Sequence, residues 1–217
     1  MSLLLALLTG CCCMPSSIPF MEDEPAHPSP LEPGISFDTE PRESMIPRAV
    51  EGFPEPAVGI VSSQCDDIQS GGPVEGPGCI TGKLTCNETI IGHTIGGVER
   101  FDSRFYEKGM CWPKLVNHDG GDERIYRLDM PEGEWTAAIV LDTPCADLNV
   151  FAVKWNGDDC PSPQHILPQC EGIAGAEKRH SLRLVSQHAS TWYVAVEGRN
   201  EEEGAFALTT MCRRGLQ

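Results

Sequence analysis

The sequence predicts an all-β fold: an antiparallel β-sandwich of about seven or eight strands that follows a disordered N-terminal linker. Three observations support this prediction. The 217-residue chain contains 22 glycines and 18 prolines, which suit turns and short strands better than helices. Beyond residue 79, apolar and polar residues alternate in short runs separated by turn residues. Cysteines are dispersed over the same region, as in domains held together by disulfide bonds.

The individual strands follow from this alternation. Over residues 125–130, Tyr126, Leu128 and Met130 fall on one face, and the intervening residues are mostly polar. The polar run Gly198–Gly204 has glycine at both ends and predicts a hairpin loop. In chain order, strands are predicted over 83–85, 89–95, 125–130, 135–141, 148–153, 182–184, 192–197 and 206–212.

The dispersed cysteines predict an exported protein. Of the 11 cysteines, three are consecutive near the N-terminus, and the remaining eight contain no Cys-x-x-Cys pair. An even, dispersed set favours disulfides in an oxidising compartment, whereas a zinc site would need close-spaced ligand pairs. The eight are Cys65, Cys79, Cys86, Cys111, Cys145, Cys160, Cys170 and Cys212.

Residues 1–10 have the character of a signal peptide. Their apolar run, Leu3–Leu8, is too short to span a bilayer, and the following Thr9, Gly10 and Cys11 resemble the lipobox of bacterial lipoproteins. This resemblance implies a membrane anchor, with diacylglycerol on Cys11, and delivery to the outer membrane or export to the periplasm or cell surface. An ordinary signal peptide is the alternative.

Residues 11–78 predict a lipidated, acidic, disordered linker. From Met14 to Gly78 the chain holds twelve of the 18 prolines, and 12 acidic against 2 basic residues give a charge of −10. Low hydrophobicity and self-repelling charge favour an extended spacer. The folded domain is therefore predicted over 79–217, with its first residue somewhere between about 62 and 80.

Charge and missing motifs exclude several functions. With 32 acidic and 16 basic residues, the chain lacks the clustered cations that nucleic acids and anionic membrane surfaces require. It contains no Gly-x-Ser-x-Gly elbow, no His-Glu-x-x-His motif and no phosphate-binding loop. We therefore predict no catalytic residue and no enzymatic activity.

Two kinds of binding residue are predicted. Asp119, Asp122 and Asp147 are candidate calcium ligands, because carboxylates in glycine-rich turns supply the oxygen atoms that calcium prefers; the alternative is that the turns themselves require Asp and Gly. Trp112 and Trp155 flank cysteines or turns and are candidates for stacking on a sugar ring. The other two tryptophans lie in alternating strands and are expected in the core.

Several strand and turn motifs between residues 79 and 212 are typical of one protein family. They are Gly92–Gly97 (GHTIGG), Phe101–Ser103 (FDS), Cys111, Gly120–Leu128 (GGDERIYRL), Asp147–Phe151 (DLNVF), Trp192–Gly198 (WYVAVEG) and Gly204–Leu208 (GAFAL). Together they resemble the cysteine-containing, pre-peptidase C-terminal-like domains of myxobacterial surface proteins. The resemblance implies a jelly-roll-like β-sandwich, usually non-catalytic, that is appended to secreted enzymes or found alone on lipoproteins.

Short loops and this resemblance also imply a set of disulfide pairings. They are Cys160 with Cys170, Cys111 with Cys79 or Cys86, and Cys145 with Cys212. The sequence as a whole predicts a non-catalytic lipoprotein module that binds a glycan, matrix or protein ligand, or acts as a spacer. The alternative is an accessory domain that aids the folding or localisation of a secreted protease.

Overall fold

The computed structural model describes residues 50–74, 78–101, 121–155, 157, 159–161, 170–173 and 178–216. All of them belong to one compact unit. Within these ranges, no helix has the length and apolar character needed to cross a membrane.

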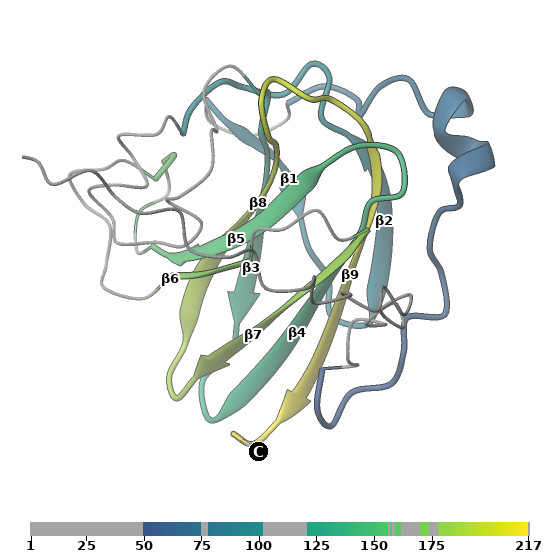
Figure 1. Ribbon diagram of the computed structural model, residues 1–217. Coiled ribbons are helices and arrows are strands. Elements are labelled where there is room, and N and C mark those ends of the chain that lie inside the picture. Colours follow the sequence, from purple (N-terminus) through teal and green to yellow (C-terminus); the bar gives the residue numbers. More distant parts are fainter. Residues whose placement is uncertain are drawn as a thin grey trace, which may run out of the picture. The chain divides into compact units, whose positions relative to one another are not determined.

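The described residues form two packed β-sheets (Figure 1). The five-stranded sheet A has the order β1-β3-β8-β5-β6, and the four-stranded sheet B has the order β2-β9-β4-β7. A short 3-10 turn, η1 (Ser62–Asp67), precedes the strands. The strands are β1 (Ile80–Lys83), β2 (Glu88–His93), β3 (Arg124–Met130), β4 (Trp135–Asp142), β5 (Leu148–Lys154), β6 (Cys170–Ile173), β7 (Arg179–Ser186), β8 (Ser190–Gly198) and β9 (Ala205–Arg214).

The main core lies between the sheets. Leu128 of β3 faces inward and is 1% exposed, whereas its neighbours Arg127 and Asp129 remain partly exposed. Inward side chains from both sheets join it, among them Ile139 and Phe206. Because successive strand residues point to opposite faces, the alternation in the sequence becomes the inside and outside of the sandwich.

Both sheets also bury part of their outer faces. On sheet A, Ile125 and Phe151 pack with Phe101 in a second apolar cluster. On sheet B, Ala138 and Val140 are covered in the same way. This double burial explains why β4, β5 and β8 are buried on both sides along most of their length.

The predicted all-β sandwich is confirmed, with two differences among the strands. β1 lies at Ile80–Lys83 rather than 83–85 and runs parallel to β3, so sheet A is not wholly antiparallel. The chain leaves sheet A after β1, forms β2 in sheet B and returns as β3, and two reversals give the two strands the same direction. β6 was not predicted, because Cys-Glu-Gly-Ile shows no alternation.

Residues 50–74, which we call the N-terminal strap, pack on sheet B (Figure 1, dark blue). Phe53 is 9% exposed and covers Val140, while Ile60 is 5% exposed and contacts Ala207. The prediction that 11–78 is one disordered linker is therefore wrong for the strap. Its few apolar residues are irregularly spaced, so no periodicity reveals that they are buried.

Three disulfide bonds are present among the described residues: Cys65–Cys145, Cys79–Cys160 and Cys86–Cys212. The predicted involvement of these cysteines in disulfides is confirmed, but the predicted pairings are wrong. Cys160 does not bond to Cys170, Cys145 does not bond to Cys212, and neither Cys79 nor Cys86 is available to Cys111. The sequence separations are 80, 81 and 126 residues, so the sheets, and not short loops, bring the partners together.

Candidate binding groove

Some predicted site residues lie outside the described part of the chain. These are Cys11, Cys111, Trp112 and Asp119. Lipidation of Cys11, stacking on Trp112 and calcium binding by Asp119 therefore stay predictions.

The other two predicted calcium ligands lie beside the loop between β8 and β9. The backbone N–H of Asp122 donates to Glu203 and that of Asp147 donates to Glu202, each at 2.7 Å. The Asp147 carboxylate forms an ion pair with Arg199 at 3.0 Å. No group of three or more His, Cys, Asp or Glu side chains within the described ranges is arranged to hold a metal ion.

The predicted stacking role of Trp155 is wrong, because the indole is buried. Trp155 is 6% exposed and packs in the outer cluster of sheet A, next to Cys79. The Cys79–Cys160 bond draws the loop after β5 onto this face. Trp135, expected in the core, lies instead at its rim, half-buried, with the Arg214 guanidinium 5.5 Å from the ring centroid.

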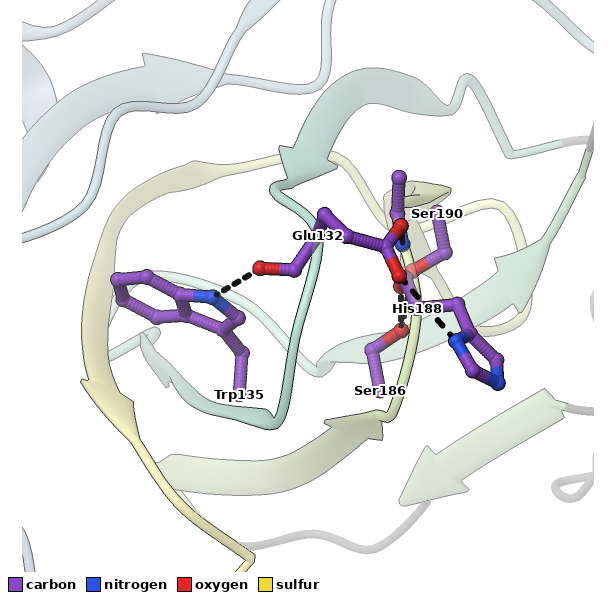
Figure 2. A network of polar contacts seen from close by, with 6 residues as sticks. Glu132, Trp135, Ser186, His188 and Ser190 are labelled. Carbon is purple, nitrogen blue, oxygen red and sulfur yellow. Dashed lines mark hydrogen bonds and ion pairs between the residues drawn. The ribbon is translucent and has the colours of Figure 1, made fainter.

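Glu132, His188 and Ser186 form a polar group at the hairpin turns β3–β4 and β7–β8 (Figure 2). His188 Nδ1 lies 3.3 Å from Glu132, but the Ser186 hydroxyl donates to the His188 backbone carbonyl at 2.6 Å rather than to the imidazole. Ser186 also bonds to the Ser190 hydroxyl at 2.7 Å. A serine nucleophile needs the imidazole as its base, so this arrangement closes two turns and does not activate a hydroxyl.

A cavity of about 410 Å³ lies beside these turns, lined by Lys154 and by Val185 to His188. The His188 side chain is 82% exposed. Exposed side chains therefore form much of this wall.

A second cavity, of about 370 Å³, has walls that are held firmly. It lies between β1 and β2, the outer strands of the two sheets at one side of the sandwich. We call it the β1–β2 groove; it is lined by Gly71, Gly72, Pro73, Thr81, Gly82, Lys83, Ile90, Ile91 and Tyr126.

Disulfide bonds hold both ends of β1, one wall of the groove. Cys79 immediately precedes the strand and bonds to Cys160, and Cys86 follows it and bonds to Cys212 of β9. Cys86 also lies just before β2, which forms the opposite wall. The groove is therefore covalently braced on both sides.

The third wall, the strap at Gly71–Pro73, is held by a buried arginine. Arg124 is 0% exposed, and its guanidinium donates to three backbone carbonyl oxygens, those of Gly72 (2.8 Å), His93 (2.9 Å) and Ile95. A Cβ on Gly71 would lie 2.2 Å from the His93 carbonyl oxygen, so only glycine permits this close approach.

Two residues that line the groove, Thr81 and Tyr126, carry hydroxyl groups. Thr81 is 8% exposed, and its buried Oγ1 has no hydrogen-bond partner within the described ranges. Tyr126 is 5% exposed, and burial raises the pKa of its phenol to about 12, so the hydroxyl keeps its proton at physiological pH. Both hydroxyls can donate and accept hydrogen bonds.

The cationic group in the groove is already paired. Lys83 Nζ lies 2.8 Å from Asp129. Burial alone would raise the pKa of Asp129, but hydrogen bonds, first from Lys83 and then from Arg127, outweigh it and hold the pKa below its usual value. The carboxylate is therefore charged at neutral pH and balances the lysine.

A pair of buried carboxyl groups lies where β3 and β8 reach the loops. Glu123 is fully buried and accepts from the backbone N–H groups of Arg100 (2.6 Å) and Phe101 (2.8 Å), which fixes the chain after β2. Burial first, and then the charge of neighbouring Glu197, raise the pKa of Glu123 to about 9. Perturbed acids often mark functional sites, but here the contacts are those of a structural anchor.

Sequence reasoning missed the groove residues. They come from four segments between residues 71 and 126, and none of them forms a motif by itself. The one indication in the sequence was the short segment between Cys79 and Cys86, which follows the glycine-rich run Gly71-Gly72-Pro73 along the chain. Glycines beside a braced strand indicate a place where backbone is approached closely.

Neither family models nor curated proteins yield a match to this chain. Among solved structures, it is similar to the pre-peptidase C-terminal domain of a collagenase from Bacillus anthracis, with a TM-score of 0.36 and 14% sequence identity. The match covers 60% of this chain and 95% of that domain.

Proposed function

We propose that this chain is an exported, non-catalytic binding module that holds its ligand in the β1–β2 groove. The ligand is a glycan, a matrix component or a protein at the cell surface. A lipid on Cys11 attaches the module to the envelope, and residues before the strap act as the spacer.

The observation that supports this proposal is the rigidity of the groove walls. Two disulfides brace β1, and Arg124 holds the strap through three backbone carbonyls. Rigid walls reduce the entropy lost on binding, and ligand sites are usually largely preformed. Export agrees with the three disulfide bonds, which persist in oxidising compartments.

Filling the groove tests the proposal. A Cβ added to Gly82 meets only the Tyr126 ring, at 3.9 Å, so Gly82→Val adds a side chain to the groove without forcing the backbone to move. Gln187→Val, at an exposed turn outside the groove, is the matched control. Wild type, G82V and Q187V are applied to immobilised gelatin and to a glycan array, after their melting temperatures are compared.

We expect the wild type and Q187V to bind the same surface and G82V to lose at least about tenfold in affinity, because its methyl groups occupy the ligand volume. Binding that is equal in all three proteins would show that the ligand site lies elsewhere. Binding of none of them to either surface would count against the function itself.

A further inference from the structure

The first part of the strap, residues 50–64, is held to sheet B by side chains. Phe53 packs on Val140, and the Glu55 carboxylate forms an ion pair with Arg179 at 3.1 Å. Within the described ranges, the backbone hydrogen bonds of this segment are local and join its own residues. Side-chain contacts of this kind open one after another, so a pull on the N-terminus peels the segment from the sheet.

Cys65 is the first covalent attachment that such a pull meets on the strap. It bonds to Cys145, which lies between β4 and β5, where the chain crosses from sheet B to sheet A. In this loop the backbone N–H of Thr143 donates to the Lys178 carbonyl at 2.8 Å, and the Thr143 hydroxyl donates to the Ala146 carbonyl at 2.9 Å. A force that arrives at Cys145 therefore acts on both sheets together.

The strap wall of the β1–β2 groove, Gly71–Pro73, lies beyond Cys65 along the chain. Of the three carbonyl oxygens that Arg124 holds, only that of Gly72 belongs to the strap. The next covalent attachment is Cys79, which bonds to Cys160. Without the bond at Cys65, a pull on the N-terminus would run along residues 66–78 and lift this wall from the groove before it reached Cys79.

We propose that the Cys65–Cys145 bond is a mechanical stop. It passes tension on the N-terminus to the junction of the two sheets, so that the strap wall of the groove stays in place under load. The inference goes beyond the proposed function, because it holds for any pull on the N-terminus, whether a lipid anchor or another molecule applies it, and it requires no ligand.

The test is single-molecule pulling of the oxidised, full-length protein between handles at its two termini. Residues 1–49 supply the same length in every variant. Peeling of the wild type should stop at Cys65 and free about 15 strap residues, an extension of up to about 5 nm. In Cys65→Ala/Cys145→Ala, peeling should continue to Cys79 and free about 29 residues, up to about 10 nm, before the sandwich unfolds.

Two further variants keep the stop. Cys86→Ala/Cys212→Ala removes a different disulfide and is the matched control; it should extend as far as the wild type before its sandwich unfolds, at a lower force. Phe53→Ala should lower the force at which the strap peels without changing the length released, because the stop is covalent.

Equal extension of the wild type and C65A/C145A before unfolding would overturn the inference, because the bond would then not limit the peeling. Extension of F53A by clearly more than about 5 nm before unfolding would overturn it as well, since the peeling would have passed Cys65. The F53A comparison retains all three disulfide bonds described above, so it decides the question even if C65A/C145A does not fold.

Discussion

Glu123 is a residue whose titration links the protein's stability to pH. Its pKa is about 9 in the folded protein and near its ordinary value of 4.5 when unfolded, so between these values the folded state binds more protons. Stability from this group is therefore fully present below the unfolded pKa and is lost as pH rises toward 9. Glu203, whose pKa burial also raises, contributes with the same sign.

We expect the free energy of unfolding to fall between pH 7 and 8.5, with a slope from Glu123 of at most about 1.4 kcal/mol per pH unit. Burial and the nearby Arg124 lower the pKa of His93, which therefore titrates below this window. Glu197→Gln removes the charge that helps to raise the Glu123 pKa, so it should reduce the slope. Urea unfolding at several pH values measures both proteins.

A control for this experiment is Glu134→Gln, an exposed glutamate in the β3–β4 turn. Its slope should equal that of the wild type. If E197Q retains the full wild-type slope as well, the charge of Glu197 contributes little and burial accounts for the raised pKa of Glu123.

At the scale of the element, β1 depends on bonds outside its own ladder. It is a four-residue edge strand with a register shift, and its pairing to β3 is parallel. Such a strand contributes few ladder hydrogen bonds, and an unpaired edge favours fraying. The disulfides at Cys79 and Cys86 compensate for this weakness.

Removing one brace should therefore loosen β1 selectively. We expect the double variant Cys79→Ala/Cys160→Ala to show faster hydrogen exchange at the amides of Ile80–Lys83, while the central pair β4–β9 stays protected. The total loss of stability should be about 2–5 kcal/mol. Hydrogen-exchange mass spectrometry and urea unfolding give the two quantities.

The matched control is Cys65→Ala/Cys145→Ala, whose bond closes a loop of similar size, with a separation of 80 residues against 81. It should lose a similar amount of stability with little change in the exchange of β1. Equal acceleration of β1 in both variants would mean that the bond at Cys79 has no local role.

At the scale of the whole molecule, the proposed anchor makes a prediction about location. In a Gram-negative host, the wild type should be found in the membrane fraction with diacylglycerol on its N-terminal cysteine, and Cys11→Ser should be found in the soluble fraction, because the lipid provides the attachment. Cys12→Ser is the control and should stay in the membrane. Fractionation and intact mass decide between these outcomes; an unlipidated wild type would refute the anchor.

The sequence predicts much of the fold and little of the site, for a physical reason. Strand β3 was recognisable because Tyr126, Leu128 and Met130 alternate with Arg127 and Asp129, a local pattern. The disulfide pairing and the burial of Trp155 depend on which distant segments the sheets bring together, and no local pattern encodes that. The groove is the extreme case, since its lining comes from four segments.

The place of β9 in sheet B has a consequence for synthesis. β9 (Ala205–Arg214) lies between β2 and β4, so β2 and the side of β4 that faces away from β7 stay unpaired until the last residues of the chain are made. If the chain is exported as proposed, N-terminus first, β2 remains unpaired through most of its passage. Completion of sheet B and closure of the Cys86–Cys212 bond therefore wait until the last strand has been made.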